Sequence, residues 1–434
     1  MYVTIDQTDY ATIRNLVYAP QTDVTGDTVP VNEFAVDIVT DDAIASGQYA
    51  ELYDDLGNLW AKYWITYAER SGSDAVHILA RSDIALLDGV TLPAAMYSAA
   101  SVGDVLDATM VRQAGEGLVA TIDYTLDSSF SSATITGYCQ EQSARERLQM
   151  VCFTIGAYVK SFFNDEIEIL PVDTTATIIP MEKTLREPLP TVKYSDYVTK
   201  VEITGFTFTS GTPSTGDEYV EVGGTTYIVA RQTYSLANTA APSGAADKVI
   251  KYEDVTLINA DNVSAILTRV AGYAFKRTGV QLDAINNGDF IPGDAVKVYA
   301  DQSAMFGGFI GSCAFSFGLQ ARAKMSVTAC VDIETATLTV LYKKGSKQLD
   351  RKEYALPVGY AYSIDNPYID ISYSGHRYIL RPQTAAVEGT LTEATTVTVQ
   401  YDVALDLHNG TLYIANVDEI TVTTEGEDTV GVIT

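Results

Sequence analysis

The stretch SARERLQMVCFTIGAYVKSFFNDEIEILPVD, residues 143–173, shows most clearly how this chain folds. Ser143 and Glu146 have the spacing of a capping box, in which each side chain accepts a hydrogen bond from a free amide of the first helical turn. The apolar residues that follow at helical spacing are Leu148, Val151, Cys152 and Ile155. Gly156 is placed to end the helix, and a tight turn at 164–165 leads into a closing strand. The pattern predicts a helix packed on a sheet rather than a catalytic element.

Two more helices are expected elsewhere in the chain. Ser101 and Asp104 form a second helix start, and apolar residues follow them at helical spacing. A third helix begins near residue 261, with Asn259 or Asp261 as its N-cap. Its apolar positions are Val263, Ile266, Leu267, Val270, Ala271 and Ala274. The segment FIPGDAVKVY, residues 290–299, then supplies a turn and a strand, so a helix–strand unit occurs twice.

Most of the remaining sequence favours strands. β-Branched residues are abundant and Tyr (28) outnumbers Phe (13), a composition typical of half-buried sheet faces. Strands are expected at 34–39, 59–68, 75–80, 198–208 and 219–230, the last with a two-residue hairpin turn at Gly223-Gly224. The predicted fold class is therefore mainly β with α/β insertions.

Turns and composition divide the 434 residues into four expected parts. These are a β region at 1–90, an α/β insertion at 91–175, a second β region with a helical insert at 176–330, and a C-terminal β module with an acidic tail at 331–434. No basic and apolar leader opens the sequence, and no run of about 18 apolar residues occurs, so neither a signal peptide nor a transmembrane helix is expected.

The net charge of −28 argues against tight binding to a nucleic-acid backbone. The charge is uneven: residues 1–142 hold 21 acidic and 5 basic residues, a net charge of −16, whereas 335–403 hold 7 of each and are neutral. Two interpretations stay open. The carboxylates either keep the protein soluble or line a channel through which a polyanion passes without sticking.

A search for reactive residues gives no active site. His77, His376 and His408 lie far apart, none at metal-ligand spacing, and His77 falls in an apolar strand as a packed or edge histidine rather than a general base. The four cysteines show no metal or redox spacing. Four acidic residues could offer Ca²⁺ ligands but do not match an EF-hand, so turn formation is the favoured interpretation: Asp23, Asp27, Asp41 and Asp42. We predict no catalytic, cofactor-binding or metal residue, no cofactor, and no enzymatic activity.

The order of these elements resembles the hub proteins of phage tails and of the baseplates of contractile injection systems. The positions that carry the resemblance are Arg145–Tyr158, Asn262–Tyr273 and Pro292–Val298, and it extends over about residues 1–330. It implies that 1–90 and 176–330 form two tube-type β-barrels. Three chains would then make a ring of pseudo-six-fold symmetry that adapts a hexameric tail tube to a three-fold tip and continues the channel.

The same resemblance implies a location and partners. The chain would be made in the host cytoplasm and act in the virion, without a membrane anchor. A tail tube or distal tail protein would lie above it, and tip, spike or fibre proteins below. The tape measure protein would occupy the lumen, through which DNA passes without specific binding.

Residues 338–404 resemble the mucin-binding-protein-type β repeat of Gram-positive surface proteins. The shared features are an opening strand with Lys343, Lys344 and Gly345, then VGYAYSI, GHRYI and GTLTEATTVTVQY. Such repeats are small β modules that often serve as spacers, so mucin binding does not follow. Two alternatives to the hub stay open: a Gram-positive surface adhesin or glycan-binding protein, and a tail-associated peptidoglycan hydrolase.

Overall fold

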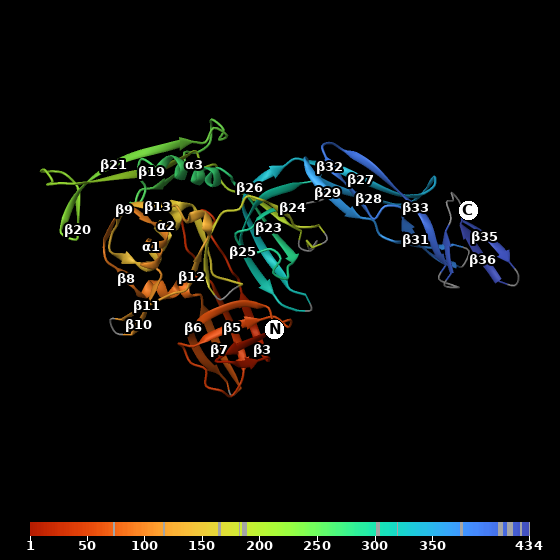
Figure 1. Ribbon diagram of the computed structural model, residues 1–434, viewed down its shortest axis with the longest axis horizontal. Helices are drawn as coiled ribbons and strands as arrows, with labels where there is room; N and C mark the ends of the chain where they lie inside the picture. The colour runs from red at the N-terminus through yellow and green to blue at the C-terminus, as the bar shows by residue number, and fades with distance from the viewer. Residues whose placement is uncertain are drawn as a thin grey trace. The chain divides into compact units, whose positions relative to one another are not determined.

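The computed structural model describes the 434 residues except 73, 116–117, 164–165, 182, 185–188, 301–303, 319, 374–375, 407–410, 415–419, 426–427 and 434 (Figure 1). The chain forms two compact units. Residues 1–300 and 306–331 make the first unit, and residues 301–305 and 332–434 make the second. The expected turn at 164–165 and His408 lie outside the described residues.

A large mixed sheet dominates the first unit. Its described strands are β1 (Tyr2–Ile5), β2 (Thr8–Tyr10), β3 (Ile13–Tyr18), β4 (Glu33–Val39), β5 (Tyr49–Tyr53), β6 (Leu59–Ser71), β7 (Ala75–Arg81), β17 (Thr177–Ile178), β18 (Thr191–Tyr194), β23 (Thr278–Ile285), β24 (Ala295–Tyr299), β25 (Met305–Ser316) and β26 (Arg322–Ile333). Neighbouring strands follow the order β18-β23-β26-β25-β3-β4-β7-β6-β5-β1-β2, and β24 adds to β25 with β17 beside it. Strands from both ends of the unit therefore share one sheet.

β3 from the N-terminal group and β25 from the C-terminal group form the seam between these two sets of strands. β3 pairs antiparallel with β25 through Tyr18 and Phe315, and an isolated bridge joins Gln21 to Ser312. The fully buried Tyr18 donates its hydroxyl hydrogen to the carbonyl oxygen of Trp60 at 2.7 Å, and its ring stacks on Phe315 at a centroid distance of 5.9 Å. The backbone amide of Thr22 donates to the Gly311 carbonyl and that of Cys313 to the Pro20 carbonyl, both at 3.0 Å, so backbone pairing and aromatic packing hold the seam together.

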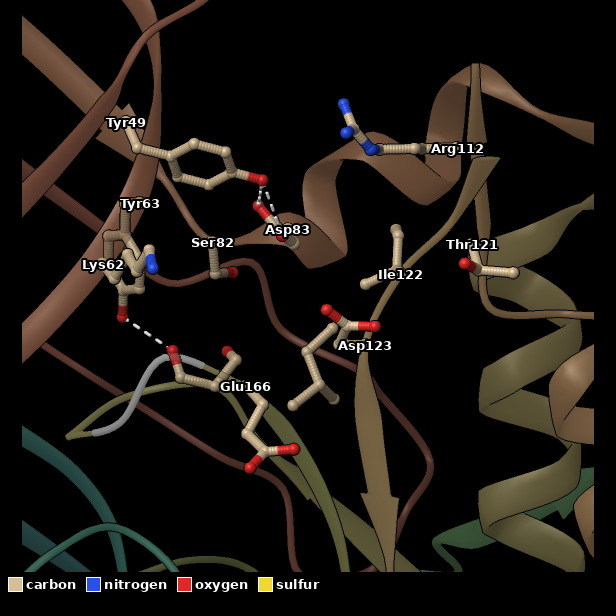
Figure 2. Close-up of a pocket in the computed structure, with 12 residues that line it drawn as sticks. Tyr49, Lys62, Tyr63, Ser82, Asp83, Arg112, Thr121, Ile122, Asp123 and Glu166 are labelled. Carbon is tan, nitrogen blue, oxygen red and sulfur yellow. Dashed lines mark hydrogen bonds between the residues drawn. The ribbon is translucent and has the colours of Figure 1, made fainter. Parts of the chain in front are cut away.

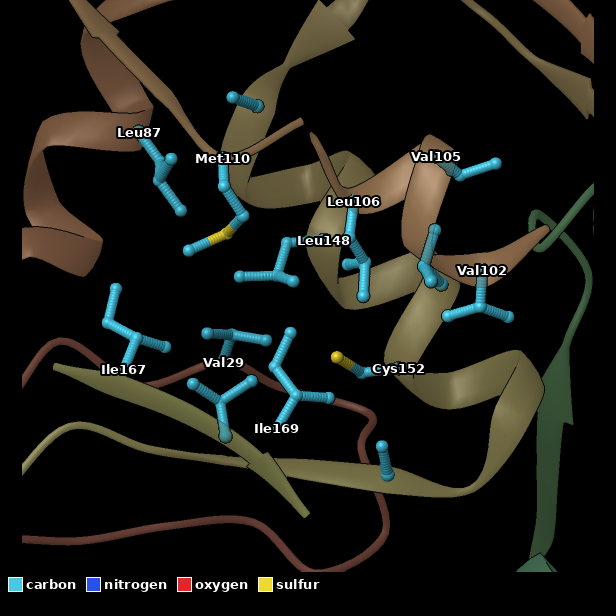
Figure 3. Packing of buried hydrophobic residues seen from close by; sticks show 14 of the residues in the cluster. Val29, Leu87, Val102, Val105, Leu106, Met110, Leu148, Cys152, Ile167 and Ile169 are labelled. Carbon is cyan, nitrogen blue, oxygen red and sulfur yellow. The ribbon is translucent and has the colours of Figure 1, made fainter. Parts of the chain in front are cut away.

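A second layer surrounds a hydrophobic core of its own (Figure 3). Its elements are η1 (Asp83–Gly89), β8 (Thr91–Leu92), β9 (Ala95–Ser101), α1 (Val102–Asp107), β10 (Val111–Gly115), β11 (Leu118–Thr121), β12 (Tyr124–Leu126), η2 (Ser128–Phe130), β13 (Thr134–Cys139), β14 (Gln142–Ser143), α2 (Ala144–Ile155), β15 (Ala157–Lys160) and β16 (Ile167–Pro171). In this layer β16 pairs parallel with β12 and antiparallel with β15.

Helix α2 has the predicted ends and buried face. The Ser143 side chain accepts a hydrogen bond from the Glu146 amide, and the Glu146 carboxylate accepts one from the Ser143 amide, so the capping box is confirmed. Gly156 closes the helix in the left-handed region at φ 79°. The predicted start of α1 is also confirmed, because the Ser101 side chain accepts from the Asp104 amide.

A third layer consists of a smaller sheet and helix α3. It contains β19 (Lys200–Ser210), β20 (Tyr219–Val222), β21 (Thr225–Ala237), β22 (Val249–Tyr252) and α3 (Val263–Ala274). The apolar face of α3 packs on this sheet. The strands expected in one barrel at 176–330 are divided between this smaller sheet and the large sheet. The N-cap of α3 is Asn262 instead of Asn259 or Asp261. The Asn259 side chain accepts from the amides of Asp261 and Asn262, which forms a turn before the helix.

The second unit is a β module. Its strands are β27 (Thr335–Lys344), β28 (Lys347–Pro357), β29 (Tyr360–Asp365), β30 (Ile369–Tyr373), β31 (His376–Pro382), β32 (Ala386–Leu391), β33 (Thr395–Asp406), β34 (Thr411–Ile414), β35 (Ile420–Glu425) and β36 (Asp428–Ile433). A core around Tyr342 and Tyr401 holds it together. The predicted fold class, mainly β with α/β insertions, is confirmed. Among the described helices, none is long and apolar enough to span a bilayer.

Candidate functional site

The large sheet of the first unit ends in strands with an open side. β18, which pairs with β23, and β2, which pairs with β1, are the two end strands of the sheet order among the described residues. The outer row of backbone amides and carbonyls of such an edge strand can pair with a strand of another chain. The two edges are therefore candidate assembly surfaces.

The β18 edge also presents aromatic side chains. Tyr194 is 60% exposed, and the guanidinium of Arg277 lies 5.1 Å from its ring centroid and 4.3 Å from that of Tyr197. Tyrosine and arginine are enriched in protein interfaces because both combine a large contact area with hydrogen-bonding groups. This edge thus has the chemistry of a protein contact as well as free backbone groups.

A polar cleft of about 270 Å³ lies between the large sheet and the α/β layer (Figure 2). Its described lining residues are Tyr49, Lys62, Tyr63, Ser82, Asp83, Arg112, Thr121, Ile122, Asp123, Ser161, Glu166 and Ile167. Tyr49 on β5 donates its hydroxyl hydrogen toward both carboxylate oxygens of Asp83 at the start of η1, at 3.1 and 3.0 Å. Sequence reasoning missed this contact, because the two residues are far apart in the chain and neither belongs to a known motif.

A buried network, three of whose members line the cleft, ties the two layers together. The side-chain amide of Asn32 donates to the Ser161 hydroxyl at 3.0 Å, and its backbone amide donates to the Ser82 hydroxyl at 3.2 Å. Tyr63 donates to the Ser161 carbonyl at 2.9 Å. Satisfied buried networks of this kind fix the relative position of the elements they join. The serines are thus occupied as structural partners.

The electrostatics of the cleft centre on Asp83. Burial raises the pKa of this carboxyl, and the hydrogen bond from Tyr49 partly opposes the rise. Burial beside the Asp83 carboxylate also raises the pKa of the Tyr49 phenol, so it keeps its proton. Asp123 and Glu166 line the same cleft, but among its described lining residues there is neither a histidine nor a cysteine. The geometry supports a Tyr49–Asp83 clamp between the two layers, not a nucleophile–base pair.

The predicted edge histidine, His77, lies on β7 opposite Asp37 of β4. Its Nδ1 is 2.7 Å from Asp37 Oδ1, and Asn15 donates to the other carboxylate oxygen at 2.6 Å. The hydrogen bond from Asn15, and then that from His77, lowers the pKa of Asp37. Both side chains are partly exposed, which suits a hydrogen-bonded pair at the surface.

Two of the four acidic residues considered as Ca²⁺ ligands, Asp23 and Asp42, have other partners. The Asp23 carboxylate accepts bonds from the amides and hydroxyls of Thr25 and Thr28, as turn formation requires. Tyr10 donates to the Asp42 carboxylate at 3.0 Å. In the described part of the chain, no group of three or more His, Cys, Asp or Glu residues could hold a metal ion.

The four cysteines are buried and unpaired. Burial raises the pKa of Cys139 and Cys330 to about 11 and that of Cys152 to about 12, and it raises the pKa of Cys313 as well. Thiols with such pKa values stay protonated at neutral pH and are poor nucleophiles and metal ligands.

Comparison with known proteins adds a fold but no family. No protein-family model and no curated protein sequence matches the chain. Two solved structures share its fold: the 43 kDa tail protein of prophage MuSo2 from Shewanella oneidensis and a tail protein from Neisseria meningitidis MC58. Each has 11% sequence identity to this chain and a TM-score of 0.51. Each alignment covers 75% of this chain, and it covers 97% of the Shewanella protein and 95% of the Neisseria protein. At this identity the likeness establishes a shared fold alone. The mucin-binding-protein-type repeat at 338–404 has no support from these comparisons.

Proposed function

We propose that this chain is a structural protein of a phage tail or phage-tail-like particle, and that it acts in the virion as the hub of the baseplate or tail tip. The single observation that carries the proposal is the large sheet with two open edges, β2 and β18, on a fold shared with two tail proteins. The unpaired backbone amides and carbonyls of such edge strands gain hydrogen-bond partners when copies of the chain meet edge to edge.

In the proposed assembly three chains form a ring. Each chain contributes two groups of strands to the large sheet, β1–β7 and β23–β26, so three chains would supply six such groups. Such a ring suits a hexameric tail tube or distal tail protein on one side and a three-fold tip, spike or fibre protein on the other. The tape measure protein would lie in the lumen before DNA passes.

The acidic bias fits this role. Residues 1–142 carry a net charge of −16, and a negative wall repels the phosphate backbone, so DNA would pass without being trapped. If the charge only keeps the protein soluble, carboxylates should instead cover all faces evenly. A surface-potential map of the assembled ring separates the two interpretations, and a neutral or basic lumen would rule out the channel wall.

Native mass spectrometry tests the assembly. We expect a trimer, and imaging of the particle should show three copies around the channel axis. Tyr194→Asp places a charge on the β18 edge and should weaken the trimer. Tyr67→Asp, at an exposed tyrosine on β6, a strand that pairs with both β5 and β7, is the matched control. A strictly monomeric chain in the assembled particle would refute the hub.

We also propose that the chain is not an enzyme. One observation favours the alternative, a tail-associated peptidoglycan hydrolase. Asp83, Asp123 and Glu166 line one cleft, and glycosidases use paired carboxyl groups. Against it, the Asp83 carboxylate is held by Tyr49. A zymogram on peptidoglycan should stay uncleared. A cleared zone that Asp83→Asn abolishes would establish the hydrolase instead.

A further inference from the structure

In the second unit, the end of β27 and the start of β28 form a two-stranded hairpin, residues 341–353, which we call the basic ribbon. β28 is the last strand of its sheet, and in the described residues it pairs with β27 alone. Between Lys347 and Glu353 every residue except Leu349 is exposed. A strand lying on a core alternates buried and exposed residues, so this part of the ribbon presents both faces to its surroundings.

The basic ribbon has a charge opposite to that of the chain. Its basic residues are Lys343, Lys344, Lys347, Arg351 and Lys352, and its acidic residues are Asp350 and Glu353, in a protein of net charge −28. Arg351 pairs with Glu353 inside the ribbon. Within the described residues no ion pair involves Lys343, Lys347 or Lys352, whereas lysines of the first unit such as Lys62 and Lys160 lie against glutamates.

The register concentrates this charge. Lys347 lies at the turn end of β28, directly opposite the buried Lys344. Lys352 lies opposite Val340 with its ammonium 5.9 Å from the Tyr342 ring centroid, on the core side of the hairpin. Lys343 lies on β27, opposite Gln348 of β28. Lys343, Lys347 and Lys352, which form no ion pair among the described residues, therefore lie within one hairpin.

We propose that the basic ribbon docks on carboxylates of residues 1–142 of a second copy of this chain, on faces of that copy turned away from the channel. Charge complementarity carries the assignment: the ribbon is an island of positive charge, and residues 1–142 have a net charge of −16. The inference rests on the proposed assembly, in which neighbouring copies hold these carboxylates at high local concentration. An external polyanion would be repelled by the rest of the chain.

Zero-length cross-linking of a mixture of ¹⁴N- and ¹⁵N-labelled full-length protein tests the docking. A carbodiimide joins lysine ammonium groups to carboxylates in direct contact, and the isotope pattern tells contacts between copies from contacts within one chain. We expect Lys347 and Lys352 to form mixed-isotope cross-links to carboxylates within residues 1–142. A trimer whose ribbon lysines cross-link only within a chain overturns the docking and leaves the hub proposal standing. A monomer in solution without mixed cross-links overturns the docking, and a single copy in the assembled particle would overturn the hub as well.

Charge reversal provides an independent test. Lys347→Glu, at the exposed end of the hairpin, and the double variant with Lys352→Glu should weaken association between copies about tenfold at low salt. The difference should shrink as salt screens the charges. Lys248→Glu, at an exposed lysine of the first unit, is the matched control and should change little. Unchanged association of the Lys347→Glu protein, or retention of the parent by polyphosphate or duplex DNA in a ribbon-dependent way, would contradict docking on a protein surface.

Discussion

Replacing Leu148 with Ala should destabilise the first unit by about 2–5 kcal/mol. Leu148 lies on the inner face of α2, is fully buried, and belongs to a core that also contains Leu87 of η1, Leu106 of α1 and Ile169 of β16 (Figure 3). The change removes three carbon atoms, and at roughly 0.8 kcal/mol for each buried CH₂ the lost burial alone costs about 2.4 kcal/mol. Because the neighbours come from separate elements, they cannot all close on the gap, and the remaining cavity adds to the cost.

Urea unfolding followed by tryptophan fluorescence measures this effect in the right unit. The two tryptophans, Trp60 and Trp64, both lie on β6 of the first unit, so their signal is independent of the C-terminal module. Leu148→Met keeps the volume and is the control, with an expected cost below about 1.5 kcal/mol. If the Leu148→Ala protein has the same midpoint and slope as the parent, the assigned packing of α2 is wrong.

Three further predictions use the same assay. Ser143→Ala should cost about 1 kcal/mol through loss of the α2 cap, and an unchanged midpoint would contradict the cap. Burial raises the folded pKa of Asp83, so its stabilising contribution is complete below about pH 3.9 and is lost as the pH rises through the folded pKa. The stability of Asp83→Asn relative to the parent should therefore increase from pH 4 to pH 7, and a difference that stays constant with pH would contradict the burial of this carboxyl. Gly137→Ala should lower the free energy of unfolding by about 3 kcal/mol or more, because φ of Gly137 is +140° and an added Cβ would lie 2.6 Å from the Thr256 carbonyl oxygen. The control, Gly103→Ala, adds a Cβ in open space and should be tolerated.

Helix α2 is predictable from sequence because every signal that specifies it is local. The Ser143–Glu146 cap, the apolar stripe and Gly156 all lie within four turns of chain. The N-cap of α3 was predicted wrongly because three candidates, Asn259, Asp261 and Asn262, stand close together. Choosing among them depends on the turn that the Asn259 side chain stabilises. Local competition of this kind has no signature in composition or periodicity.

The sheet order and the cleft could not be predicted in the same way. The contact of Tyr49 with Asp83 joins β5 to η1, and the contact of His77 with Asp37 depends on the register of β4 against β7. Both arise from pairing between distant segments, which a single sequence does not encode in its spacing. The division of 198–237 and 278–333 between two sheets likewise depends on α3 covering the smaller sheet.

The pairing of β3 with β25 sets the order in which the first unit can mature during synthesis. Tyr18 emerges from the ribosome almost the full length of the unit before its partner Phe315, so the aromatic seam cannot close until nearly all of that unit has been translated. Contacts of such long sequence separation are slow to form, because the chain entropy of a large loop is lost before the contact stabilises it. The N-terminal strands therefore spend most of translation with a bare edge at β3, a state open to mispairing with other nascent chains. Completion of the seam, rather than formation of any helix, is then the step that separates a vulnerable nascent chain from a subunit ready to assemble.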